Sequence, residues 1–445
     1  MSAALDYSYQ YPFASNVTTL DNGLGLTLAT CDGKLENPHF FEGLVKSPKI
    51  TADMMVQLAT IVGTRFWNPI DWAALDPVLT SNDEIIRLEG FSGCCGVYCR
   101  IDMNADAFDA DIHRRGTTNV DFNREMRISL AKIKESDTVK LGIGADEFVM
   151  QRGDHKTVEK KVKLPIRWVK GFTEVQAYQP GMELKFDCSG AEALRFIRSL
   201  PKGKSKGAWV QRAGKGLRIT QRESKDAVRI DGFARVRVLE TLAMRAKKLR
   251  VYGHASGTSA WELVFDNSRF TILISPELAR GFSGEGQVLS DLAGAEWESI
   301  LPRVQAALNW QSIINEDAVC KESGITKQQF KSALSALAAR GLVGYDLESN
   351  AYFHRVLPFD MDKIQALQPR LKAAYALIEE NGVRLHKQSD KQIEFLVNGT
   401  DVKHRVRLSE DADKCSCQWF SKYQGERGVC KHILAARIFH EDNEA

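Results

Sequence analysis

The sequence has no hydrophobic run long enough to cross a membrane. No stretch of about 18 apolar residues occurs in the 445-residue chain, and residues 1–16 lack a basic segment followed by an apolar one. The net charge is small, at +3, so any affinity for nucleic acid must come from locally concentrated charge. These absences predict a soluble, cytoplasmic protein.

A recognisable catalytic constellation is also absent. No closely spaced pair of acidic residues accompanies a histidine in a loop, as hydrolase or nuclease chemistry would need. Gly203-Lys204-Ser205 imitates the end of a phosphate-binding loop, but Arg198 occupies the place of the required earlier glycine. We therefore expect no enzymatic activity and no catalytic residues, with a hydrolase or nuclease as a third hypothesis.

The nine cysteines do not form the dense pattern of a disulfide scaffold, which fits a reducing compartment. Cys94, Cys95 and Cys99 could form a metal site with His39 or His113. However, adjacent cysteines point to opposite sides of a strand, so they chelate poorly. Buried cysteines that act as small hydrophobic side chains are the favoured interpretation.

Length and composition predict several domains of the α+β class. The chain is 44% hydrophobic and 26% charged, as in ordinary globular proteins, and 445 residues exceed one core. Helix and strand patterns divide it into a mixed α/β domain (1–155), a basic α+β domain (156–290), a winged-helix-like module (291–360) and a zinc module (361–445).

The middle domain shows an apparent internal repeat. A short amphipathic helix over 191–200 and another over 237–248 are each followed by three strand-like segments. This pattern predicts a pseudo-symmetric sheet with two helices on one face, an arrangement also used by sliding-clamp-like and TATA-binding-like folds. Before the repeat, alternation over 162–168 predicts a strand, which Pro165 would place at an edge.

Positive charge is concentrated in this middle domain. Residues 191–250 contain seventeen Lys and Arg against five Asp and Glu. Such a surface attracts phosphates through counterion release, although a solvated basic face or a dock for an acidic protein would have the same composition. The candidate nucleic-acid-binding residues here are Lys202, Lys204, Lys206, Arg212, Lys215 and Arg218.

The next segment resembles a winged helix. Helical patterns over 297–310 and 316–322, and a third helix capped by Thr326, precede two strand-like segments around Glu348-Ser349-Asn350. The third helix is usually the one that enters the major groove, and its candidate contacts include Lys327 and Lys331. Two lysines are few, so the module could equally bind protein or only pack.

The most specific motif lies near the C-terminus. Cys415, Cys417, Cys430 and His432 form two pairs that each skip one residue, and a helical pattern follows Cys430. Three thiolates and an imidazole suit the tetrahedral coordination of Zn²⁺, whereas the alternative is four unligated core residues. With four protein ligands no position is left to activate water, so the predicted zinc is structural. Aromatic residues at 419, 420 and 423 could cover it or form a contact.

This C-x-C…C-x-H pattern resembles the SWIM-type zinc finger. The preceding segment around Tyr352-Phe353-His354 is similar to bacterial SWIM zinc-finger proteins, which extends the resemblance to residues 300–445. The resemblance implies DNA or protein interaction, and as partners a MoxR-like AAA+ ATPase and a von Willebrand A-domain protein. A lone histidine such as His354 is more often a packing residue than a ligand.

The preferred interpretation is a non-enzymatic zinc protein that binds DNA or another nucleic acid through its basic middle domain. The alternative is a protein-interaction adaptor for an AAA+ ATPase system. Residues 362–445 contain fourteen basic and thirteen acidic residues, so charge composition alone would not hold the zinc module on a duplex.

Overall fold

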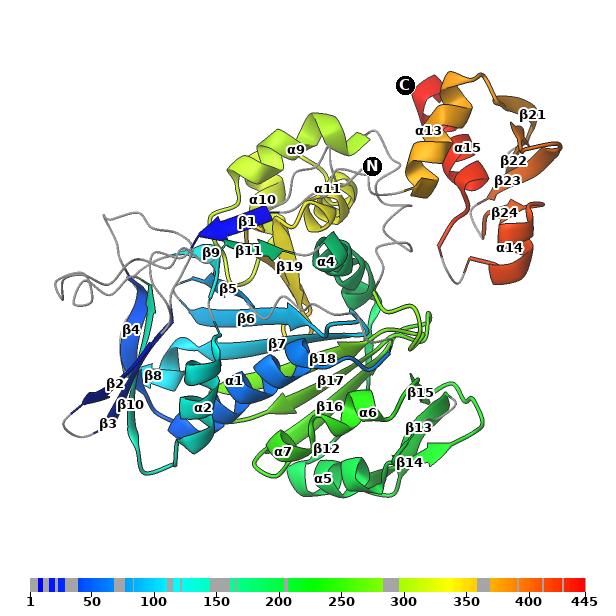
Figure 1. Cartoon of the computed structure of the whole chain (residues 1–445). Helices are drawn as coiled ribbons and strands as arrows, with labels where there is room; N and C mark the ends of the chain where they lie inside the picture. The colour runs from blue at the N-terminus through cyan, green and yellow to red at the C-terminus, as the bar shows by residue number, and fades with distance from the viewer. Residues whose placement is uncertain are drawn as a thin grey trace.

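A computed structural model gives the arrangement of the chain (Figure 1). The structure describes residues 7–10, 16–20, 23–28, 39–67, 77–82, 84–109, 115–120, 122–144, 161–164, 166–203, 207–282, 296–357, 369–389, 392–409, 412–425 and 428–444. Within these ranges no helix has the length and apolarity of a membrane span. Helices and several separate sheets occur together, which confirms the predicted multi-domain α+β class.

The largest sheet has eight strands, and all neighbouring pairs are antiparallel. In order across the sheet the strands are β12 (Glu183–Ser189), β16 (Lys248–Gly253), β17 (Ser259–Val264), β18 (Ser268–Ile274), β7 (Val97–Asn104), β6 (Ile85–Phe91), β5 (Val78–Ser81) and β9 (Gly116–Asn119). At its centre β7 pairs with β18. Strands from both sides of residue 155 therefore share one sheet.

Two similar units meet at this central pair. Helix α1 (Pro48–Gly63) precedes β5–β7, and the short helices α6 (Ala234–Arg237) and α7 (Glu240–Ala243) precede β16–β18. Helix α1 packs on β6, β7 and α7. The expected single helix over 237–248 is wrong, because the chain forms two short helices and enters β16 at Lys248. Arg235 anchors the first of them by donating to the Gly96 carbonyl (3.0 Å) and the Ser275 hydroxyl (2.8 Å).

The remaining sheets of this part of the chain are smaller. One has three strands, and the others have five and two. The three-stranded sheet has the order β14 (Gly216–Thr220), β13 (Ala208–Ala213) and β15 (Val228–Ile230). The five-stranded sheet has the order β2 (Asn16–Leu20), β3 (Gly23–Leu28), β10 (Thr138–Gly144), β4 (His39–Val45) and β8 (Phe108–Asp109). The two-stranded sheet pairs β1 (Tyr7–Gln10) with β11 (Lys161–Leu164). The first strand trio of the expected repeat thus forms a sheet of its own, separate from β16–β18.

Side-chain caps fix the starts of the neighbouring helices. Asn123 accepts from the Met126 N–H at α2 (Arg124–Lys132), and Ser189 and Glu192 form a capping box at α5 (Gly190–Ser199). Two short 3₁₀ segments, η1 (Ala105–Ala107) and η2 (Gln179–Gly181), connect other elements.

The expected strand over 162–168 is only half correct. Strand β11 ends at Leu164, and helix α4 (Ile166–Tyr178) begins two residues later. Proline at 165 lacks an N–H and has a φ suited to a helix start, so a proline-containing alternating pattern is ambiguous. On α4, the rings of Trp168 and Phe172 lie 5.8 and 4.9 Å from that of Phe91 on β6, which fixes the helix against the large sheet.

Residues 296–354 form three helices and a hairpin in the expected order. The elements are α9 (Glu296–Ala306), α10 (Glu316–Ser323), α11 (Lys327–Ala339), β19 (Val343–Asp346) and β20 (Ala351–His354). Thr326 caps α11 in a capping box with Gln329. Helix α11 packs on α9 and α4. His354 is a packing residue: it accepts from the Trp310 N–H (2.8 Å) and stacks on that ring.

The hairpin is buried against the eight-stranded sheet through a cluster of charged side chains, which the alternating hydrophobic pattern of the strands does not predict. Asp346, 4% exposed, accepts two hydrogen bonds from Arg269 (3.0 Å each), and Arg100 donates to the Tyr345 carbonyl (2.7 Å). Just after the hairpin, Arg355 pairs with Glu89 at 2.5 Å, both fully buried. The strands of the hairpin are thus packed into the protein, although its turn at residues 348–350 is exposed.

The C-terminal module has its own small core. Helix α13 (Pro369–Glu379) packs on α15 (Lys431–Glu444), which in turn packs on a four-stranded sheet. The sheet consists of β21 (Val383–Ser389), β22 (Gln392–Asn398), β23 (Lys403–Ser409) and β24 (Lys414–Cys415), and a short helix α14 (Gln418–Tyr423) follows it. In Figure 1 both long helices lie on the same side of this sheet.

Candidate metal centre and nucleic-acid interface

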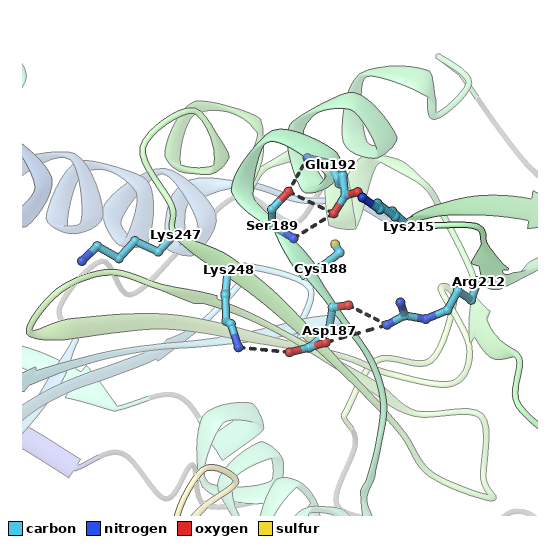
Figure 2. Close-up of a pocket in the computed structure, with 8 residues that line it drawn as sticks. All are labelled: Asp187, Cys188, Ser189, Glu192, Arg212, Lys215, Lys247 and Lys248. Atoms are coloured by element: carbon cyan, nitrogen blue, oxygen red, sulfur yellow. Dashed lines mark hydrogen bonds and ion pairs between the residues drawn. The ribbon is translucent and has the colours of Figure 1, made fainter.

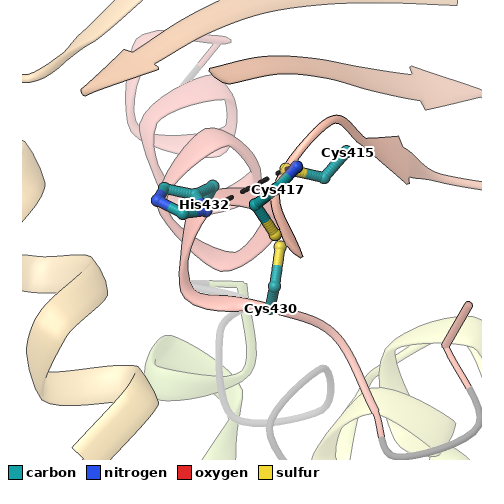
Figure 3. Close-up of side chains that lie close together, drawn as sticks. All are labelled: Cys415, Cys417, Cys430 and His432. Atoms are coloured by element: carbon teal, nitrogen blue, oxygen red, sulfur yellow. Dashed lines mark hydrogen bonds between the residues drawn. The ribbon is translucent and has the colours of Figure 1, made fainter. Parts of the chain in front are cut away.

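The structure brings the four predicted zinc ligands together (Figure 3). Cys415 ends β24, Cys417 is the N-cap of α14, Cys430 directly precedes α15, and His432 lies in the first turn of α15. Their sulfur and nitrogen ligand atoms all lie within 4.8 Å of one another. All four residues are at most 6% exposed. Turns between the elements thus place two ligand pairs face to face.

The donor set and spacing fit zinc. In a tetrahedral site with Zn–S bonds of about 2.3 Å, neighbouring ligand atoms are about 3.7 Å apart. Cys415 Sγ and His432 Nδ1 are 3.9 Å apart. The other ring nitrogen, Nε2 of His432, is buried without a hydrogen-bond partner in the described structure. Three thiolates in one buried site would carry negative charge that Zn²⁺ balances, and the neutral imidazole can supply the fourth lone pair.

Contacts among the thiols perturb their proton affinities in opposite directions. Hydrogen bonding to Cys417 raises the pKa of the Cys415 thiol, and hydrogen bonding to Cys415 lowers the pKa of Cys417. Two backbone N–H groups support the sulfurs: that of Cys417 donates to Cys415 Sγ and that of Phe420 to Cys417 Sγ, both at 3.4 Å. Such N–H···S contacts favour the thiolates that zinc requires.

Aromatic residues surround the centre. The rings of His404 and His432 have centroids 4.4 Å apart. Trp419 and Phe420 are partly buried against the module core, and the Arg370 guanidinium lies 4.8 Å from the Trp419 ring centroid. Trp419 and Phe420 therefore pack beside the site.

The candidate nucleic-acid-binding residues of the middle domain have different surroundings. Lys204 and Lys206 lie outside the described residues, and Lys202 is exposed. Arg212 donates to the Asp187 carbonyl (2.6 Å) and lies 3.8 Å from its carboxylate. A shallow pocket beside β12 brings two of the candidates together with other charged side chains (Figure 2). Its lining residues are Asp187, Cys188, Ser189, Glu192, Arg212, Lys215, Lys247 and Lys248.

Acidic residues outside the 191–250 window neutralise part of its charge. Lys248 pairs with Asp187 (3.1 Å), and Lys247 pairs with Asp266. Arg250 pairs with Glu262 (3.1 Å) and Glu348, and Arg245 with Glu135 (3.3 Å). Counting charge along the sequence therefore overstates the positive potential of the folded domain.

Five cations of the 191–250 window that have no ion-pair partner among the described residues lie on or beside the three-stranded sheet. They are Lys215 in the β13–β14 turn, Arg218 on β14, Arg222 and Lys225 in the following loop, and Arg229 on β15. Trp209 on β13 lies opposite both Thr220 and Arg229. Because strand neighbours in register share a face, this sheet presents a half-buried indole flanked by an arginine.

The candidates on α11 lie apart from this sheet. Lys327 is exposed and pairs with Asp317 at 2.7 Å, which also raises its pKa. Lys331 is exposed one turn further on. Their role as groove contacts stays a prediction.

The comparisons with known proteins concern the C-terminal module. Residues 404–436 match the family model described as SWIM zinc finger. No curated protein matches the chain. Among solved structures, proliferating cellular nuclear antigen from Entamoeba histolytica matches with a TM-score of 0.37 and 11% identity, over 54% of this chain and 99% of that one. At that TM-score and identity, the likeness does not indicate a shared fold or function.

The family match begins on β23 and ends within α15, so it contains all four clustered ligands. The sequence match and the geometry thus point to the same four residues. Residues 404–436 of the C-terminal module are therefore a SWIM zinc finger, whose Cys415, Cys417, Cys430 and His432 fit a structural zinc ion.

Proposed function

We propose that the protein is a non-enzymatic, zinc-stabilised nucleic-acid-binding protein that contacts its polymer through the three-stranded sheet of the middle domain. The observation that carries this proposal is the cluster of cations without ion-pair partners around Trp209. Phosphate contacts by Lys and Arg release counterions from the polymer. A tryptophan face with an adjacent arginine can stack on a base, which contributes about 1–3 kcal/mol per base.

The zinc is assigned a structural role in this proposal. Its four protein ligands fill a tetrahedron, so it would hold the short β24, α14 and α15 together rather than activate a water. When bound, Zn²⁺ supplies the charge that keeps three thiolates and an imidazole in one buried site. The chain's own contribution is to position these donors by two turns and one helix start.

Charge reversal on the three-stranded sheet tests the proposal. We expect the triple variant Lys215→Glu, Arg218→Glu and Arg229→Glu to lose at least tenfold in affinity for labelled nucleic acid at low salt. Three lost contacts should also flatten the slope of log K against log salt by about 2–3. Fluorescence anisotropy with single- and double-stranded DNA and RNA measures both quantities.

A matched control carries the same charge change elsewhere. Arg124→Glu, Lys132→Glu and Lys134→Glu alter three exposed cations on or beside α2, and this variant should keep both affinity and salt slope. If wild-type protein binds no nucleic acid even at low salt, the proposal is wrong. The basic sheet would then be treated as a dock for an acidic protein, as in the adaptor hypothesis with an AAA+ partner.

A further inference from the structure

The four-stranded sheet of the zinc finger has one covered face and one open face. Helix α15 packs on β22 and β23, and α13 packs on α15, so both helices lie on the covered side. Side chains alternate between the faces of a strand. The side chains on the covered side form the module core: Val383, Phe395, Val397, Val406 and Leu408. The alternate residues of each strand therefore face away from the helices.

The strand register arranges these outward residues in rows across the sheet. Arg384 lies opposite Leu396, which lies opposite Arg405. A second row runs across all four strands from Lys387 through Glu394 and Arg407 to Lys414. Lys403 continues the outward side of β23. The strand residues that the structure describes thus give the open face six cations and one carboxylate.

The single carboxylate neutralises only one of these cations. Glu394 accepts hydrogen bonds from Nε and Nη2 of Arg407 (3.0 and 2.7 Å), and these bonds lower its pKa, with Arg405 and His386 adding to the effect. The other five cations have no ion-pair partner among the described residues, and each is exposed. They are Arg384, Lys387, Lys403, Arg405 and Lys414.

Charge in this module is segregated rather than in excess. Residues 362–445 hold nearly equal numbers of basic and acidic residues, yet the open face is almost entirely basic. Acidic residues that lie elsewhere include Glu379 at the end of α13 and Asp413, which pairs with Arg437 of α15 (2.6 Å). A flat face of one sign concentrates positive potential in spite of a neutral total.

We propose that this open face, defined by Arg384, Lys387, Lys403, Arg405 and Lys414, binds the phosphate backbone of a nucleic-acid duplex. Because neighbouring strands are about 4.8 Å apart, the second row is about 14 Å wide. The major groove of B-DNA has a similar width of about 12 Å. Lys387 and Lys414, at the two ends of that row, can therefore reach phosphates on both sides of the groove.

The composition of the face selects the duplex over other partners. Its outward residues include no Phe, Tyr or Trp among those the structure describes, and single-strand binding relies on such rings for stacking. Stable protein interfaces have aromatic or other large apolar side chains at their centre. Among the outward strand residues that the structure describes, only Leu396, half-buried, is apolar, and the exposed Leu385 and Val402 lie at the β21 edge and in the β22–β23 turn. Phosphate contacts need neither feature.

This inference rests on the proposed nucleic-acid function and adds a second contact to the same polymer. Two modest sites on one chain strengthen each other through their effective concentration, provided that one duplex can reach both. The three-stranded sheet, with Trp209, and the zinc-finger face would then differ in their preference for single-stranded or double-stranded nucleic acid. Only the latter would depend on double-stranded structure.

The test uses full-length, zinc-loaded protein and the triple variant Lys387→Gln, Arg405→Gln and Lys414→Gln. We expect its slope of log K against log salt on a duplex of about 20 base pairs to become shallower by about 2.7, since each lost contact removes about 0.9. Affinity for a single strand should change less than threefold. Anisotropy titrations on duplex DNA, duplex RNA and single strands separate these effects.

The control variant Lys134→Gln, Lys372→Gln and Lys422→Gln removes three exposed cations that lie off this face. It should keep the wild-type slope, and both variants should retain one zinc per chain and the wild-type melting temperature. Competition by polyglutamate as effectively as by duplex would overturn the proposal, because it would show a general anion surface.

The outcomes also separate this inference from the proposed function. If the zinc-finger variant keeps the wild-type slope while the Lys215, Arg218 and Arg229 variant loses affinity, the inference is wrong and the middle-domain site stands. The reverse result removes the middle-domain site and supports the zinc-finger face. Absence of any binding by wild-type protein overturns both.

Discussion

The zinc ligands belong to the small apolar core of the C-terminal module. Cys415, Cys417 and Cys430 belong to the same buried cluster as Phe395 and Leu434. A module of this size depends on its metal for much of its stability, because the free energy of binding zinc is also free energy of folding. Loss of a single ligand should therefore affect the whole module.

We predict that Cys430→Ser abolishes stoichiometric zinc binding and makes residues 369–444 sensitive to protease. Structural zinc contributes about 10–16 kcal/mol in small zinc-finger peptides, far more than such a core can replace. Metal analysis and limited proteolysis with mass spectrometry measure the two effects. Cys320→Ser, at a half-buried free cysteine of α10, should leave both unchanged. A zinc-loaded, resistant Cys430→Ser protein would contradict the assignment.

The zinc ligands could be predicted from the sequence because their signal is local. Four ligand-type residues at fixed offsets lie within eighteen positions, and the helix start at Cys430 could be seen beside them. The basic open face could not be predicted in this way. Lys387, Arg407 and Lys414 become neighbours only through strand register, and their region is neutral in composition.

At the scale of elements, the β19–β20 hairpin is fixed to the large sheet by buried charge. Burial alone would raise the pKa of Asp346, but the nearby Arg100 and Arg269 hold it well below its usual range. An Asp in the unfolded chain has a pKa of about 4. A carboxylate whose pKa is lowered in the folded protein therefore contributes its full stability above that pH. That contribution is lost as the pH falls further and the carboxylate is protonated.

We predict that Asp346→Asn lowers the free energy of unfolding by about 3–5 kcal/mol at pH 7, because it removes one of the carboxylates that balance the buried Arg100 and Arg269. The difference from wild type should narrow below pH 4. Urea denaturation at several pH values measures it. Glu348→Gln, at a half-exposed position of the same hairpin, should cost at most about 1 kcal/mol. Equal effects of the two variants would contradict the role of burial.

Element positions were largely predictable, whereas their assembly was not. The caps of α2, α5 and α11 and the apolar alternation of β13–β18 are short-range features. The charged residues of β6 and β7 are the sequence feature that reflects this assembly. Arg87, Glu89, Arg100 and Asp102 alternate with apolar residues inside buried strands. Charges at alternate positions of an apolar strand indicate a partner on that face.

At the scale of the whole molecule, the described residues form three separate apolar cores. One lies around the eight-stranded sheet, one among α9–α11 and one in the zinc finger. The zinc-finger core meets the large unit through few apolar contacts, among them Ala177 of α4. Such cores can unfold in separate steps.

We predict that a zinc chelator removes a single calorimetric transition, that of the C-terminal module, and leaves the transition of the large unit within about 2 °C. Bound metal stabilises only the part of the chain that must fold to bind it. Differential scanning calorimetry with and without chelator measures this, and restored zinc should restore the lost transition. A uniform shift of all transitions would show that the cores unfold together.

The β7–β18 pair also constrains the order in which the chain can fold during synthesis. Partners in this pair are more than 160 residues apart, from Met103 with Ser268 to Val97 with Ile274. Until residue 274 has left the ribosome, β7 has a free edge, and exposed strand edges favour association with other chains. The nascent protein therefore passes through a long interval in which its first half depends on chaperones or on rapid elongation to stay unassociated.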